Sequence, residues 1–195
     1  NSIKEVCLYF DNKLFRGNRT TKVNSDQFKA YASFNYPELA KSGVDLKINF
    51  EDLYKPQNSS PIFYDKLDDR VSVMRLYPGI SKQNVKHMFS DNYSKVVIIE
   101  SYGSGNIFNY KWFIDELKSS IEKGKYIINV SQCPKGSVKM GKYESSFKLV
   151  ELDIISGKDI TLESAIIKSM FLLSMKIDFK NFKKMFELSI SGEIS

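Results

Sequence analysis

The second half of the chain alternates between short apolar runs and longer stretches with helical spacing. Three of the apolar runs have strand length, at 71–77, 96–99 and 126–130. The middle run, Val96-Val97-Ile98-Ile99, is continuously apolar, which is typical of a strand buried on both faces of a parallel sheet. Strands that alternate with helices through short, right-handed connections predict an α/β fold with an open parallel βαβαβ sheet.

Helical stretches surround these runs, and two of their ends carry capping signals. Ser81 can accept a hydrogen bond from an amide of the first turn, so we expect a helix to begin directly after it. Gly124 favours the end of another helix, because glycine readily adopts the left-handed conformation found beyond helix C-termini. The predicted helices are 82–89, 109–122, 144–152, 161–174 and 179–187.

The first fifty residues show a different pattern of short extended pieces. Two apolar runs flank the turn-forming residues 11–13, which predicts a β-hairpin. Proline is favoured at the first position of a helix, so Pro37 predicts a single helical turn. The predicted pieces are hairpin strands at 6–10 and 14–15, an extended piece at 28–33, the helical turn at 37–40 and a half-buried strand at 44–49.

Periodicity is lost between the two halves of the chain. Residues 51–61 contain two prolines and two serines and no regular apolar spacing, which is typical of an interdomain linker. We therefore expect residues 1–50 to be the end of one domain, 51–61 to be a linker, and 62–195 to be a second domain.

Composition and charge exclude several classes of protein. With 42% hydrophobic residues and five prolines, the chain can bury a real core. No apolar run approaches the roughly 18 residues of a membrane span, so no membrane partner is expected. The net charge is +6, but the 29 basic residues are interleaved with 23 acidic ones, so we expect no nucleic-acid partner. Cys7 and Cys133 are expected to be buried free thiols, and His87 to be structural or solvated, with no metal site.

The longest polar loop follows the hairpin. Nine of the eleven residues from Arg16 to Asp26 are polar or charged, and loops of this kind on a rigid scaffold often carry function. Lys22 lies among hydroxyl side chains, where a partly desolvated lysine can lose its proton and accept one from a nucleophile. The alternative is that Lys22 is an ordinary solvated surface charge.

A second polar loop, Gly103-Ser104-Gly105-Asn106, follows a strand and precedes a helix. Ligands of open α/β sheets gather beyond the carboxyl ends of the strands, where backbone amides can hold an anion. The third glycine of the dinucleotide-binding fingerprint is absent, so a dinucleotide site is not expected. Cys133 follows another strand, but no histidine lies near it in the sequence to activate it as a nucleophile.

Five segments of the chain resemble, in order, the C-terminal part of type I (cytoplasmic) bacterial L-asparaginases. They are Arg-Gly-Asn-Arg-Thr-Thr-Lys (16–22), Phe-Lys-Ala-Tyr-Ala-Ser (28–33), Asn-Tyr-Pro-Glu-Leu-Ala (35–40), 98–107 and 129–143. The resemblance implies the tail of a larger N-terminal α/β domain, followed by a smaller, flavodoxin-like C-terminal domain with the open parallel sheet.

The resemblance also implies an activity, the hydrolysis of L-asparagine to aspartate and ammonia through a threonine nucleophile. Lys22 matches the catalytic lysine of the family. Asn106 matches, at or near its position, an asparagine that binds the substrate amino group across a dimer interface. The family uses no metal or organic cofactor, is cytoplasmic, and assembles as a homodimer or homotetramer.

Two expectations follow from what the sequence lacks relative to the family. The nucleophilic threonine of the family lies in a Thr-Gly-Gly-Thr turn, and a second threonine lies in a Gly-Thr-Asp-Thr run; neither occurs in these 195 residues. We therefore expect the nucleophile to lie in an N-terminal segment absent from this chain, and the 195 residues alone to be inactive. Glu100 stands where some relatives have an arginine that supports an effector site, so such regulation is not expected.

Two alternatives to an asparaginase remain open at the level of sequence. One is the asparaginase-like subunit of a tRNA-dependent amidotransferase, which would release ammonia to a partner subunit. The other is a non-catalytic α/β interaction module.

Overall fold

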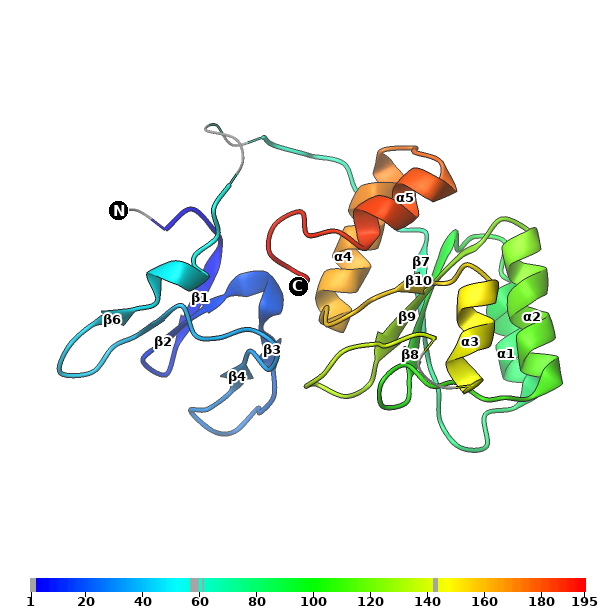
Figure 1. Ribbon diagram of the computed structural model, residues 1–195, viewed down its shortest axis with the longest axis horizontal. Helices are drawn as coiled ribbons and strands as arrows, with labels where there is room; N and C mark the ends of the chain where they lie inside the picture. The colour runs from blue at the N-terminus through cyan, green and yellow to red at the C-terminus, as the bar shows by residue number, and fades with distance from the viewer. Residues whose placement is uncertain (1–2, 57–59, 61, 142–143) are drawn as a thin grey trace.

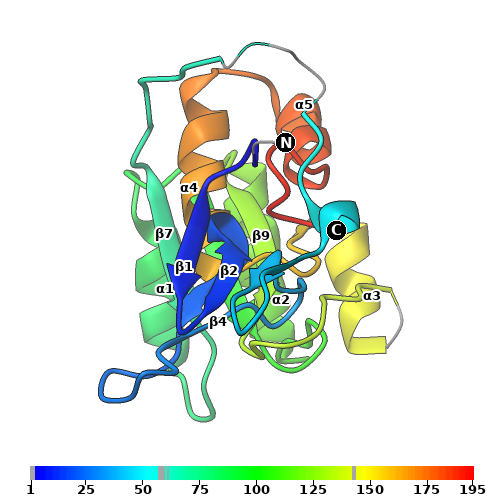
Figure 2. The ribbon, with the colours of Figure 1, turned by 90° about the vertical axis from the view of Figure 1, so that its left-hand side faces the viewer.

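The computed structural model describes residues 3–56, 60, 62–141 and 144–195. Small antiparallel sheets form the N-terminal region, and a parallel sheet covered by helices forms the C-terminal region (Figure 1). Figure 2 looks through the N-terminal strands onto the helices and sheet of the C-terminal region. Hydrogen bonds connect the two regions, for example from the Asn18 side chain to the Ser191 carbonyl at 3.0 Å. The mixed α/β fold predicted from the sequence is confirmed.

The predicted hairpin is present in the N-terminal region. It pairs β1 (Cys7–Phe10) with β2 (Lys13–Arg16), and Phe10 lies opposite Lys13 across a two-residue turn. Asp11 and Asn12 form this turn with φ angles of 48° and 60°, the left-handed conformation that a tight hairpin turn requires. The sheet continues through β5 (Ala40–Lys41) and β6 (Lys47–Ile48) in the order β1-β2-β5-β6.

The helical turn predicted at 37–40 is wrong. The amide of Leu39 donates to the carbonyl of Leu14 at 2.7 Å, and Ala40 begins β5 opposite the same residue. Pairing with β2 therefore takes the backbone groups that a helical turn would have used. The strand predicted at 44–49 is shorter than expected, because Val44 lies in an exposed bend and only Lys47–Ile48 pair with β5.

The parallel sheet of the C-terminal region is confirmed. Its strands are β7 (Val71–Arg75), β8 (Val96–Ser101), β9 (Tyr126–Ser131) and β10 (Ile155–Ser156), in the order β10-β9-β8-β7. All six residues of β8 are buried, as the continuous apolar run indicated. The strands follow chain order, whereas flavodoxin has its first strand between the second and third. The strand β10 was not predicted, because two residues are too few to show a periodic pattern.

Helices cover both faces of this sheet. Alternate residues of β8 point to opposite faces, so Val97 and Ile99 pack in one core and Val96 and Ile98 in the other. Ser81 caps α1 by accepting the amide of Asn84 at 3.1 Å, as predicted. The first core contains α1 (Lys82–Ser90), α2 (Lys111–Glu122) and α3 (Glu144–Glu151), and the second contains α4 (Leu162–Ser174) and α5 (Phe179–Phe186). Among the described residues, no helix is long and apolar enough to cross a membrane.

Candidate active site

Lys22 lies within the polar loop that follows the hairpin, residues 16–26. The loop forms a 3-10 turn, η1 (Gly17–Arg19), and then the short strand β3 (Thr21–Lys22), which pairs with β4 (Tyr31–Ala32). Lys22 is opposite Tyr31, and its Nζ atom lies 5.9 Å from the centre of that ring. The partial desolvation considered for Lys22 is not found among the described residues, because its side chain is exposed. Lys22 does not line the cavity beside η1. Its amine is therefore accessible to a group supplied from outside these residues.

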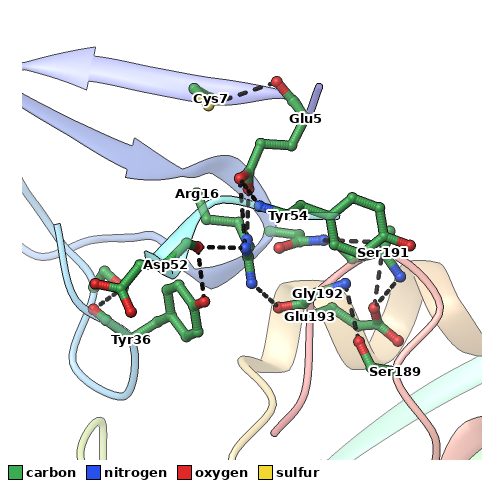
Figure 3. Close-up of polar contacts among 12 residues, drawn as sticks. Glu5, Cys7, Arg16, Tyr36, Asp52, Tyr54, Ser189, Ser191, Gly192 and Glu193 are labelled. Atoms are coloured by element: carbon green, nitrogen blue, oxygen red, sulfur yellow. Dashed lines mark hydrogen bonds and ion pairs between the residues drawn. The ribbon is translucent and has the colours of Figure 1, made fainter. Parts of the chain in front are cut away.

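The loop that carries Lys22 is fixed by a buried arginine that sequence reasoning missed. The guanidinium of Arg16 pairs with Glu5 at 2.5 Å, and their side chains are only 6% and 4% exposed. The same group donates to the carbonyls of Asp52 at 3.0 Å and Gly192 at 3.3 Å (Figure 3), and it lies 4.1 Å from the centre of the Tyr36 ring. Burial disfavours the charge, but the Glu5 carboxylate outweighs it and raises the pKa of Arg16.

A second buried arginine holds the next turn of the loop. Arg19 is 2% exposed, and its guanidinium lies 3.0 Å from the Asp159 carboxylate and also donates to the Ser195 hydroxyl. Burial alone would raise the pKa of Asp159, but hydrogen bonds from Ser195 and the charge of Arg19 lower it. Arg16 and Arg19 thus connect the loop of residues 16–26, called the lysine loop below, to residues about 140 to 176 positions away in sequence.

Helix α4 and the segment that follows α5 provide further contacts to the same loop. Asn18 donates to the Ser191 carbonyl at 3.0 Å, and its own carbonyl accepts from the Ser164 hydroxyl. The Thr21 hydroxyl, directly before Lys22, donates to Glu163 at 3.3 Å. A cavity of about 370 Å³ lies between the loop and α4, with a mainly apolar wall that includes Ile167, Phe171 and Ile190.

The loop that carries Asn106 is fixed in another way. Tyr102 and Asn106 exchange backbone hydrogen bonds of 2.9 and 2.8 Å directly after β8, so Asn106 lies beyond the carboxyl end of this strand, as predicted. Gly105 has a φ of 104°, and a Cβ there would lie 2.7 Å from Val138, so only glycine fits. The carbonyl of Gly105 accepts from the Asn129 amide at 3.0 Å.

The other residues considered as candidates are Glu100, His87 and the two cysteines. Glu100 pairs with Arg75 at 3.3 Å. His87 is exposed on α1, and both cysteines are free thiols. The expectation that both thiols are buried is wrong: Cys7 is only partly buried, and Cys133 is exposed because it lies in the loop after β9. The described residues contain no group of three or more side chains that could hold a metal ion.

The fold and these two loops define an α/β protein with two polar loops, one after the N-terminal hairpin and one after a strand of the parallel sheet. Buried side chains hold both loops. The class is identified further by family comparison. Residues 1–54 match the family model of the N-terminal asparaginase domain, and residues 70–186 match that of the glutaminase/asparaginase C-terminal domain. The chain therefore belongs to the glutaminase/asparaginase family.

Individual relatives agree with this assignment. The chain is 34% identical to L-asparaginase 1 of Escherichia coli K12 over 99% of its own length and 57% of that protein. It is 29% identical to one of the subunits of the glutamyl-tRNA(Gln) amidotransferase of Pyrococcus furiosus, over 92% of the chain and 41% of that relative. The crystal structure of L-asparaginase I from Vibrio cholerae superimposes with a TM-score of 0.90 at 30% identity, covering 99% of this chain and 58% of that one.

Proposed function

We propose that the full-length protein hydrolyses L-asparagine to L-aspartate and ammonia. The observation that carries the proposal is the match to L-asparaginase 1 along 99% of the chain, which includes the polar loop with Lys22. The chain spans about 57% of that relative, so the activity is proposed for the whole protein and not for these 195 residues alone. No metal or organic cofactor takes part in the proposed reaction.

In the proposed reaction a threonine from polypeptide outside this chain attacks the side-chain amide carbon of asparagine. Lys22 keeps the proton moving: the proton of the attacking hydroxyl is transferred through the Lys22 amine to the leaving nitrogen, which departs as ammonia. Water hydrolyses the resulting acyl ester to aspartate and restores the threonine. Lys22 suits this role because its amine is exposed to an incoming hydroxyl, while the loop behind it is held by Arg16 and Arg19.

Further parts of the proposal concern the assembly. Asn106 would bind the substrate amino group in the site of a neighbouring protomer, in a cytoplasmic homodimer or homotetramer. Its position beyond the carboxyl end of β8, in a loop fixed by Asn129, supports such a role. The division into 1–50, 51–61 and 62–195 is likewise proposed, and the two family matches support a boundary in this part of the chain.

The experiment that tests this function is ammonia release from L-asparagine by the full-length protein and its Lys22→Met variant. We expect turnover to fall by at least about 100-fold, since proton transfer by a positioned side chain contributes this much. The matched control is Lys29→Met, which replaces another exposed lysine, located between β3 and β4. This variant should keep normal turnover. Substantial turnover by Lys22→Met would exclude the assigned role, as would enzyme-like turnover by the 195 residues alone.

The similarity to part of an amidotransferase supports a second candidate, an ammonia-releasing subunit of a tRNA-dependent amidotransferase. This candidate requires a partner subunit and charged tRNA for ammonia release. Turnover of free L-asparagine by the purified protein without either component would decide against it.

A further inference from the structure

A buried ion pair supports the C-terminal segment that holds the lysine loop. Lys168 of α4 and Glu193 lie 2.5 Å apart, with side chains only 4% and 5% exposed. The ammonium of Lys168 also donates to the carbonyl of Leu188 at 2.6 Å. It thereby connects the two ends of the segment 188–193, which follows α5 and returns toward the N-terminal region (Figure 1).

The carboxylate of Glu193 shapes this segment from inside. It accepts the amide of Ser191 at 2.7 Å and the amide of Ile190 at 3.1 Å. With these amides directed inward, the carbonyls of Ser191 and Gly192 are left to accept hydrogen bonds from the lysine loop. Asn18 donates to the first at 3.0 Å. Arg16 donates to the second at 3.3 Å (Figure 3).

The contact between Gly192 and Arg16 leaves no room for a side chain at position 192. Gly192 has a φ of 84°, and a Cβ at this position would lie 2.5 Å from Nη1 of Arg16. Between Arg16 and Lys22 the loop is held internally, because the Thr20 hydroxyl donates to the Arg16 carbonyl at 2.7 Å. The position of Arg16 is therefore transmitted to Lys22 through a short, hydrogen-bonded segment.

We propose that Lys168 and Glu193 are positioning residues for Lys22, through the turn 188–193 that their ion pair shapes. The inference rests on the proposed function, in which the Lys22 amine transfers a proton. It extends that function by assigning a role to two side chains that are remote from Lys22 in sequence. A displacement of about 1 Å in a catalytic group can lower turnover by about 100-fold, so a small change in this turn is sufficient to affect the reaction.

The test compares three variants of the full-length protein. Glu193→Gln removes the charge of the side chain and keeps its shape. Gly192→Ala displaces Arg16 without removing a charge. The control is Asp115→Asn, which removes the carboxylate of an exposed ion pair, the one that Asp115 makes with Lys111. For the first two we expect kcat to fall by about 10- to 100-fold with KM changed less than about twofold. We also expect faster amide hydrogen exchange across residues 16–22. The control should change neither quantity.

Several outcomes separate this inference from its alternatives. If Glu193→Gln folds and keeps both kcat and the exchange rates of residues 16–22, the inference is wrong. If Glu193→Gln does not fold, Gly192→Ala decides alone, and an unchanged kcat there overturns the inference. A purely structural pair would lower the melting temperature without slowing kcat in the folded enzyme. Failure of the proposed function is distinct, because Lys22→Met would then retain turnover whatever the exchange experiment shows.

Discussion

The two loops of the candidate site reach a fixed shape by opposite routes. The loop with Lys22 is held by groups from distant parts of the chain, chiefly the carboxylate of Asp159 and the backbone carbonyls of Ser191 and Gly192. The loop with Asn106 is held by the neighbouring strand, through Asn129 and Ser101, which lie fewer than thirty residues apart. The position of Lys22 therefore depends on how the two regions of the molecule pack, whereas the position of Asn106 is a property of the parallel sheet.

This difference has a consequence for how each loop responds to change. A substitution that disturbs the contact between the regions should move Lys22 and leave the Asn106 loop in place. A substitution inside the parallel sheet should do the reverse. Variants of similar cost in stability can therefore be distinguished by which loop they loosen.

The largest effect is expected for Arg16→Met. It leaves the buried Glu5 carboxylate without its cation and removes two hydrogen bonds to backbone carbonyls. The free energy of unfolding should therefore fall by about 3–5 kcal/mol. Urea denaturation of the full-length protein measures this. Arg70→Met is the control, because its pair with Asp68 is exposed and should contribute about 1 kcal/mol or less. Equal losses in the two variants would contradict the role of Arg16.

Glu193→Gln should lower the free energy of unfolding somewhat less at neutral pH, by about 3 kcal/mol, because it leaves Lys168 unpaired but keeps a hydrogen-bond acceptor. Burial alone would raise the pKa of Glu193, but Lys168 and the amide of Ser191 lower it. A lowered carboxylate pKa gives stability that is present above the unfolded pKa of about 4.3 and lost as the pH falls through the folded pKa. The difference between the two proteins should therefore shrink below about pH 4.3, as urea denaturation across pH can measure; a constant difference would contradict this account.

Asn129→Ala should destabilise the protein by about 2 kcal/mol, since it leaves the buried Ser101 hydroxyl and Gly105 carbonyl with fewer partners. Amide hydrogen exchange should increase in residues 102–106 and stay unchanged in residues 16–22. Increased exchange in both loops would show that the two are coupled and would contradict their independent support.

The smallest effects are expected from two helix caps. Ser81 and Thr161 each accept a hydrogen bond from an amide of the first helical turn. Replacing either residue by alanine should therefore lower the free energy of unfolding by about 1 kcal/mol. Only Thr161→Ala affects α4, whose first turn contacts the lysine loop through Glu163 and Ser164. Exchange in residues 16–22 should therefore rise in Thr161→Ala and not in Ser81→Ala.

Local sequence patterns predicted the elements of the fold well. The hairpin, the buried strand β8 and the cap at Ser81 each follow from neighbouring residues, and each is present. The helical turn at Pro37 was wrong because pairing with β2 is a contact that no local signal shows.

The supports of the candidate site could not be predicted in the same way. In a polar loop Arg16 and Arg19 have the pattern of solvated charges, and Lys168 lies on a helix whose other buried residues are mainly apolar. Their partners Glu5, Asp159 and Glu193 are identified only when the chain is folded. A buried charge is favourable only with its partner, and the sequence gives no register for contacts that cross between regions.

A crystal structure of the full-length protein with L-aspartate bound tests the central claim most directly. The account predicts that the Lys22 amine lies within about 2.6–3.2 Å of a threonine hydroxyl supplied from outside these 195 residues, the distance that proton transfer requires. It also predicts that Arg16 still donates to Gly192. A Lys22 amine that remains in solvent, with no hydroxyl or substrate atom near it, would contradict the account.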